Sequence, residues 1–127
     1  MFDHLSVGVT NLERSLAFYD TVFAPLGIKR SFNLPHVAAY GPEGRPMFWI
    51  GYKDEPFTNV TPSEGFHLAF QADNRKAVDE FYAAAISAGA KDDGKPGLRP
   101  HYHPNYYAAF VIDPDGYRIE AVCHKPE

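Results

Sequence analysis

The sequence predicts a small α+β domain built from two similar modules, and two observations carry this prediction. The chain has 127 residues with 45% hydrophobic content, which suits a single folded core. A pair of motifs then repeats with the same internal spacing: His4-Leu5 precedes Phe18-Tyr19, and His67-Leu68 precedes Phe81-Tyr82. Repetition of this kind indicates a fold with two equivalent halves.

Each repeated histidine lies in a stretch with the alternating pattern of a half-buried strand. The apolar positions of these strands are Leu5, Val7 and Val9 in the first copy and Phe66, Leu68 and Phe70 in the second. Because successive side chains of a strand point to opposite faces, His4 and His67 lie on the face away from the apolar one. The two copies therefore agree in polarity.

An amphipathic helix is predicted after each of these strands. The first begins at Thr10-Asn11-Leu12-Glu13, which fits a capping box with Thr10 as the cap, and it ends before Gly27. The second is capped by Asp73 or Asn74 and ends before Gly89. The apolar stripes that pack on the core are Leu12, Leu16, Tyr19 and Phe23 in the first helix and Val78, Phe81, Tyr82 and Ala85 in the second.

Turns and short extended runs follow each helix, so each half consists of a strand, a helix and further strands. The extended runs are residues 37–40 and 47–52 in the first half and residues 106–112 and 117–123 in the second. The Pro-containing, polar stretch 54–65 is the predicted linker. Module one then covers about residues 1–58 and module two about residues 65–127 of one domain.

Composition excludes several classes of protein. The formal net charge is −4 and no run of Lys and Arg exceeds a pair, so a nucleic-acid partner is not expected. No stretch approaches the roughly 20 apolar residues of a membrane span. The single cysteine, Cys123, permits neither an intrachain disulfide nor a thiolate cluster, and its strand position predicts a buried thiol. We therefore expect a cytoplasmic protein without nucleic-acid or membrane partners.

A third candidate metal ligand lies in the last predicted strand. Alternation places Glu120 on the less apolar face of residues 117–123, as it does His4 and His67 in their own strands. Two imidazoles and one carboxylate suit Fe, Mn, Zn, Ni or Co as divalent ions and leave positions for substrate or water. Since modules related by a pseudo-twofold axis bring their first strands together around a shared cavity, we predict one divalent metal ion on His4, His67 and Glu120.

The loop 98–107 is the candidate substrate loop because it concentrates polar aromatic residues between prolines. His101 or His103 could act as a general acid or base, since imidazole titrates near neutrality. Tyr106 could donate a hydrogen bond to an oxyanion beside the metal. The alternative is a surface loop in which these rings only stack.

Two further residues are candidates for substrate binding. Arg118 shares a strand face with Glu120. It could bind an anionic substrate, or it could contact the Glu120 carboxylate and hold it in its orientation. It could equally be an exposed arginine. Trp49 could line the cavity or fill the core.

The sequence resembles the vicinal oxygen chelate superfamily, which includes glyoxalase I, extradiol dioxygenases, fosfomycin resistance transferases and bleomycin-binding proteins. The resemblance covers the whole chain. It rests on Phe2-Asp3-His4-Leu5, the Phe18-Tyr19 helix, His67, and Asp113-Pro114-Asp115-Gly116 before Glu120. It implies two βαβββ modules forming an open, curved mixed sheet around a central cavity, with metal ligands at His4, His67 and Glu120. It also implies a homodimer with sites sometimes shared between chains.

The resemblance to glyoxalase I is incomplete at one position. That enzyme has a fourth ligand in the first module, and aligning Pro42-Glu43-Gly44 with Pro114-Asp115-Gly116 places it at Phe48 or Trp49. Neither side chain can bind a metal. The ligand count therefore favours three-ligand relatives such as extradiol dioxygenases and thiol transferases, although the dioxygenases usually have longer chains.

The predicted function is that of a small-molecule metalloenzyme. Its cation would chelate two neighbouring oxygens of the substrate and stabilise an enolate-like or oxyanionic intermediate. Glyoxalase-like lyase or isomerase chemistry and extradiol-dioxygenase-like ring opening both remain open. The alternative is a metal-free protein of the bleomycin-resistance type that binds a small molecule or an antibiotic in its aromatic-lined cavity.

Overall fold

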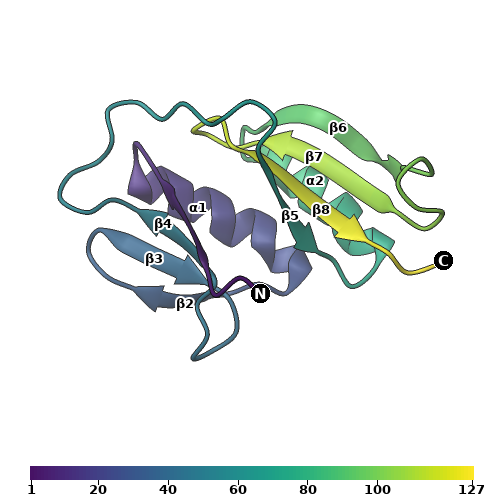
Figure 1. Cartoon of the computed structure of the whole chain (residues 1–127), viewed down its shortest axis with the longest axis horizontal. Helices are drawn as coiled ribbons and strands as arrows, with labels where there is room; N and C mark the ends of the chain where they lie inside the picture. Colours follow the sequence, from purple (N-terminus) through teal and green to yellow (C-terminus); the bar gives the residue numbers. More distant parts are fainter.

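The computed structural model describes residues 1–127 and contains two βαβββ modules (Figure 1). The first consists of β1 (Leu5–Gly8), α1 (Leu12–Phe23), the 3-10 turn η1 (Ala24–Leu26), β2 (Arg30–Asn33), β3 (Val37–Tyr40) and β4 (Phe48–Gly51). The second consists of β5 (His67–Gln71), α2 (Arg75–Ser87), β6 (Lys91–Leu98), β7 (Tyr107–Ile112) and β8 (Arg118–Cys123). The predicted α+β fold is confirmed. Neither helix has the length and apolar character that a membrane crossing requires.

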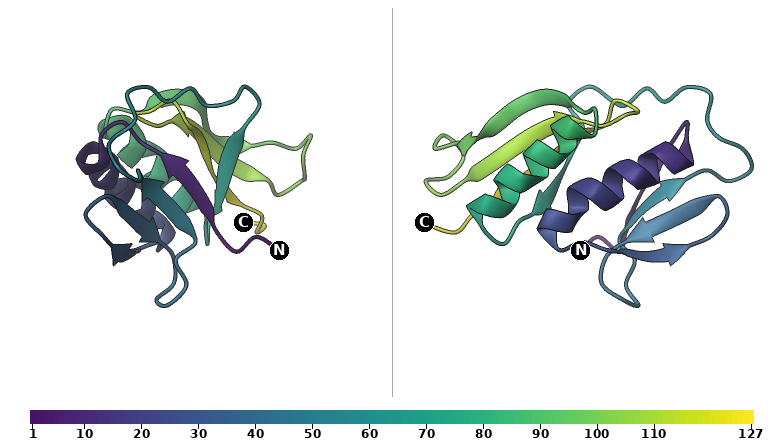
Figure 2. Two further views of the ribbon diagram at one scale, coloured as in Figure 1. Left: turned by 60° about the vertical axis from the view of Figure 1, so that its left-hand side comes forward. Right: turned by 180° about the vertical axis from the view of Figure 1, so that it is seen from behind.

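Both modules arrange their strands in the same way. The sheet orders are β1-β4-β3-β2 and β5-β8-β7-β6, with the first and last strand of each module paired in parallel and the other pairs antiparallel. The sheets are open and do not close into a barrel. Seen from behind, α1 and α2 run side by side across the backs of the two sheets (Figure 2). The opposite faces of both sheets are left uncovered by helices.

A single apolar core lies between the helices and the sheets and joins the two modules. Phe23 of α1 packs against Phe70 of β5 with ring centroids 4.7 Å apart, and Phe48 of β4 packs against Phe70 at 5.3 Å. Of the predicted stripes, Tyr19, Phe23, Val78, Phe81 and Ala85 are fully buried, and Leu12, Leu16 and Tyr82 are partly buried. Cys123 is buried, as predicted.

The start of α1 differs from the predicted capping box. Asn11 is the cap, since its side chain accepts the backbone N–H of Arg14 at 3.0 Å. The predicted cap, Thr10, instead donates its hydroxyl to Asp115 at 2.6 Å. The prediction of Thr10 was wrong because a carboxylate from the other module competes for its side chain. In α2, Asn74 is the cap, which was one of the two predicted.

Two strands, β2 and β6, do not follow from alternation in the sequence. The β6 strand contains Gly94, Pro96 and Gly97, and its pairing with β7 shifts register on both sides of Gly94. Both strands lie at sheet edges, where proline and irregular pairing are tolerated. Their residues consequently carry no regular pattern.

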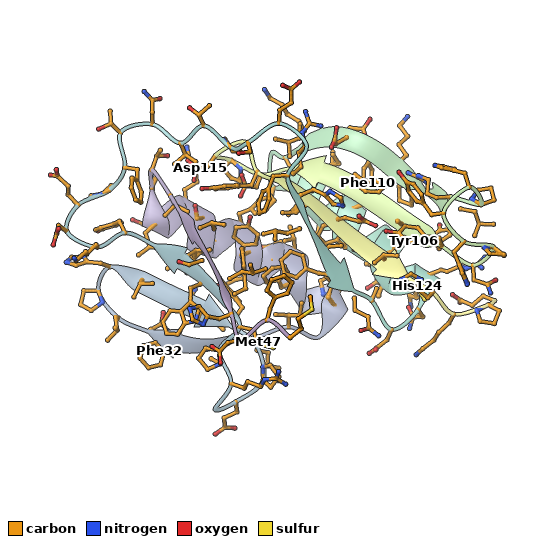
Figure 3. The ribbon with its side chains drawn as sticks, viewed as in Figure 1. Phe32, Met47, Tyr106, Phe110, Asp115 and His124 are labelled. Carbon is orange, nitrogen blue, oxygen red and sulfur yellow. The ribbon has the colours of Figure 1, made fainter.

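A polar network ties the turn before β8 to the start of α1. The side chain of Asp115 is only 3% exposed. It accepts hydrogen bonds from the Thr10 hydroxyl at 2.6 Å, the Thr10 amide at 3.3 Å and the Arg14 guanidinium at 3.3 Å. Nearby, the Tyr117 hydroxyl donates to the carbonyl of Gly8 at 2.8 Å. These contacts fasten the second module to the first near the upper edge of the molecule, where Asp115 is labelled (Figure 3).

Asp113, in the same turn, gives a pH dependence to stability. Burial raises the pKa of its carboxyl above the ordinary 3.8, and hydrogen bonds from Tyr19, Tyr117 and Asp115 offset this only in part. A carboxyl with a raised pKa favours the fold when protonated, so its contribution is complete below its unfolded-state pKa and is lost as the pH rises through the folded-state value.

We therefore expect the free energy of unfolding of the wild type, relative to Asp113→Asn, to fall as the pH rises above about 4. The fall should be about 1.4 kcal/mol for each unit by which the two pKa values differ. Urea denaturation of both proteins from about pH 4 to about pH 7 measures it. A difference between the two proteins that stays constant or grows with pH contradicts this assignment.

Candidate metal site

The candidate site lies at the centre of the second sheet, on the face away from the helices. Ile119 and Ala121 join the core on the helix side, so Glu120 points to the opposite face. Glu120 pairs with Ala69 of β5 on one side and with Phe110 of β7 on the other. Its residue exposure is only 1% although it carries a carboxylate. Three strands thus fix one buried acidic group in a central position.

His67, at the start of β5, faces this carboxylate. Its Nε2 atom lies 3.1 Å from Oε1 of Glu120, and this contact is not a hydrogen bond. The Oε1 atom is buried and has no hydrogen-bond partner. An unpartnered buried carboxylate oxygen is unfavourable, which makes this a position that a cation would stabilise.

The geometry of the pair fits a metal. Two ligand atoms that are each about 2.1 Å from one cation lie about 3 Å apart at the right angle of octahedral coordination and about 3.4 Å apart at the tetrahedral angle. The Nε2 atom of His67 and Oε1 of Glu120 are separated by 3.1 Å. The donor types, the spacing and the free carboxylate oxygen all suit two neighbouring ligands of one divalent ion.

His4 lies in the first module, away from this pair. Its ring packs edge-on to Trp49 with centroids 6.4 Å apart, and its Nδ1 atom lies 2.5 Å from a carboxylate oxygen of Asp3. No group of three or more His, Cys, Asp or Glu side chains within the chain could hold a metal ion. The structure therefore brings together two of the three predicted ligands, His67 and Glu120.

The strand register identifies the residue at the position where glyoxalase I has its fourth metal ligand. In the first sheet Ser6 pairs with Trp49, and in the second Ala69 pairs with Glu120. Ser6 and Ala69 each follow the repeated histidine by two residues, so Trp49 is the counterpart of Glu120, whereas Phe48 lies in the core. Trp49 packs against Phe32 at 5.3 Å. The first module thus offers one imidazole beside an aromatic wall.

Tyr106 contacts Glu120 directly. Its hydroxyl donates a short hydrogen bond to Oε2, the carboxylate oxygen that does not face His67. The ring packs edge-on against Tyr102 at 5.1 Å. It also packs edge-on against His124 at 5.0 Å, and Figure 3 labels Tyr106 and His124. Burial and, after it, the bond to Glu120 raise the pKa of Tyr106, so the hydroxyl keeps its proton near neutral pH.

The predicted acid–base histidines lie on the exposed loop between β6 and β7. The His101 ring packs against Tyr102 in a tilted arrangement, with centroids 4.2 Å apart. The Nδ1 atom of His103 accepts the backbone N–H of Asn105 at 3.1 Å. Neither histidine hydrogen bonds to Glu120, so only Tyr106 of the predicted loop residues reaches the carboxylate.

Arg118 and two residues that the sequence did not mark complete the surroundings of Glu120. Arg118 forms an ion pair with Asp93 at 2.9 Å and does not hydrogen bond to Glu120. The ring of Phe110 lies edge-on to His67 at 6.3 Å, and the guanidinium of Arg99 lies 5.4 Å from the centre of that ring. The alternation of β7 could have indicated Phe110. Arg99 belongs to a loop, and no pattern marks it.

Comparison with known proteins identifies the family. Residues 1–121 match the sequence profile of the Glyoxalase/Bleomycin resistance protein/Dioxygenase superfamily, and the chain belongs to this superfamily. A lactoylglutathione lyase of Neisseria meningitidis (serogroup A, strain Z2491) is 33% identical over 96% of this chain and 89% of the lyase. The family membership expected from the sequence is therefore confirmed.

Solved structures agree with this assignment. A glyoxalase/bleomycin resistance protein from Albidiferax ferrireducens T118 is 32% identical, covers 99% of both chains and superposes with a TM-score of 0.81. A glyoxalase/bleomycin resistance protein/dioxygenase family enzyme from Burkholderia phytofirmans PsJN has 21% identity and a TM-score of 0.72, covering 97% of this chain and 98% of its own. The second likeness extends to the fold alone.

Proposed function

We propose that this protein is a metal-dependent enzyme that carries out lyase or isomerase chemistry on a small substrate with two neighbouring oxygens. One observation carries the proposal: the buried Oε1 atom of Glu120 has no hydrogen-bond partner and faces Nε2 of His67 at 3.1 Å. His67 and Glu120 would hold a divalent cation there, and the cation would supply a Lewis acid for the substrate oxygens. The similarity to a lactoylglutathione lyase favours lyase or isomerase chemistry over oxygenation.

The third ligand, His4, would come from a second copy of the chain. Each chain carries two donors on its second module and one on its first, and the side chains of His4 and His67 are 52% and 50% exposed. A symmetric dimer brings the same two surfaces together twice. Such a dimer would form two equal sites, each with His67 and Glu120 from one chain and His4 from the other.

The remaining residues would bind and orient the substrate. Phe110 forms one wall beside His67, and Trp49 forms another beside His4. Tyr106 holds the carboxylate, and either His101 or His103 would move a proton from the adjoining loop. Arg118 would attract an anionic group, because its guanidinium is half-exposed despite the ion pair with Asp93.

Metal content tests the proposal. Protein purified without chelators or affinity tags should carry about one divalent ion per chain, and elemental analysis measures it. His67→Ala and Glu120→Ala should each weaken metal binding by more than about a hundredfold. Loss of a residue that only hydrogen-bonds to a ligand already lowers metal affinity by about tenfold to a hundredfold. Glu80→Ala is the control, because it removes an exposed carboxylate of α2.

The alternative outcome is informative as well. A wild-type protein that is empty and takes up none of Fe, Mn, Zn, Ni or Co would exclude the catalytic proposal. The better account would then be a metal-free binding protein, for which the aromatic pair of Phe32 and Trp49 supplies a contact surface.

A further inference from the structure

The carboxylate of Glu120 has one hydrogen-bonded oxygen and one free oxygen. A carboxylate offers about four acceptor sites, and a buried one normally fills them. Here the Tyr106 hydroxyl is the only group that donates a hydrogen bond to it, and the acceptor is Oε2. The other oxygen, Oε1, has no donor although it is buried. The difference between the two oxygens is therefore produced by a single side chain.

Tyr106 is itself held firmly in place. Its backbone N–H donates to the carbonyl of His103 at 3.1 Å, and its own carbonyl accepts the backbone N–H of Arg99 at 2.7 Å. Its ring lies against Tyr102 and His124. Backbone and ring together fix where the hydroxyl points.

We propose that Tyr106 is a positioning residue that assigns the two oxygens of Glu120 to different tasks. The phenol binds Oε2, stops rotation of the carboxylate group and keeps Oε1 directed toward His67 as the single oxygen available to a cation. Hydrogen bonds from neutral donors to an ionised carboxylate are among the stronger ones, so this restraint is effective. The proposal rests on the proposed metal-dependent function.

The structure supplies a matched control in the next residue. The hydroxyl of Tyr107 also donates to a carboxylate, that of Asp79 on α2, at 2.6 Å. Because Asp79 belongs to α2, this bond lies on the helix side of the sheet and not beside Glu120. Tyr107→Phe therefore removes the same kind of bond one residue further along the chain.

The experiment compares the affinity for Co²⁺ of wild type, Tyr106→Phe and Tyr107→Phe, by competition with a coloured chelator. We expect Tyr106→Phe to bind Co²⁺ about tenfold to a hundredfold more weakly, as is typical when a partner of a metal ligand is lost. Tyr107→Phe should stay within about twofold of the wild type. Equal affinity of the Tyr106→Phe protein and the wild type overturns the proposal.

A second measurement needs no variant and so does not depend on the folding of Tyr106→Phe. Infrared difference spectra of the wild type on addition of Co²⁺ report the splitting of the carboxylate stretches, which is wide for one coordinating oxygen and narrow for two. A wide splitting supports the role of Tyr106, and a narrow one overturns it while leaving the metal site intact. A wild type that binds no Co²⁺ overturns the proposed function and this inference together.

Discussion

Mixing two variants that each fail to bind metal, His4→Ala and His67→Ala, is expected to restore about a quarter of the sites. If each site takes His4 from one chain and His67 with Glu120 from the other, a mixed dimer gathers both substitutions in one site and leaves its other site whole. Random exchange of subunits makes half of the dimers mixed, and each of these has one working site. Elemental analysis after mixing, exchange and removal of free metal measures the recovery.

The control mixture is His67→Ala with Glu120→Ala. Both substitutions lie in the half of the site that the second module supplies, so every mixed dimer has one damaged ligand in each site. No metal binding should return. If all three variants are folded and dimeric but metal binding returns in neither mixture, each site is built within one chain.

Replacing Asp115 with alanine is expected to destabilise the fold by about 3 kcal/mol. The change removes the acceptor of the Thr10 hydroxyl and amide and of the Arg14 guanidinium. Because the Asp115 side chain is 3% exposed, water cannot easily take its place beside the part-buried Thr10 donors, each of which costs about 1–3 kcal/mol when left unpaired. The Arg14 guanidinium is exposed and can turn to water. Urea denaturation at neutral pH measures the loss.

Asp79→Ala is the matched control for this experiment. Asp79 accepts a hydrogen bond from Tyr107 at 2.6 Å, but it is exposed, so water can satisfy the hydroxyl that the variant leaves. Its effect should be below about 1 kcal/mol. A similarly small effect of Asp115→Ala would mean that the network between the turn and α1 does not hold the modules together.

The elements with a regular pattern could be predicted from the sequence. Alternation around His67 and Glu120 placed both on one face of a sheet, and the structure puts them on neighbouring strands β5 and β8. The pattern failed for β2 and β6, because edge strands tolerate glycine, proline and shifts of register. The capping-box pattern also failed for the first turn of α1, because the Thr10 hydroxyl donates a hydrogen bond to Asp115.

The assembly of the site could not be predicted from the sequence. Alternation states which face of a strand a residue occupies, but the distance between His4 and His67 depends on how two modules pack, and that is set by the shared core and the Asp115 network. Phe48 and Trp49 were both possible counterparts of Glu120, and only the pairing of β4 with β1 shows that Trp49 is the counterpart. The contact of Tyr106 with Glu120 arises at the end of a loop, where no periodic pattern exists.

The two modules share one backbone arrangement but differ in chemistry at one equivalent position. Trp49 pairs with Ser6 in the first sheet, and Glu120 pairs with Ala69 in the second. The second half then presents the donor pair His67 and Glu120 where the first half presents an aromatic surface beside His4. The half that carries Phe32 and Trp49 can change its side chains without disturbing the other half's donors.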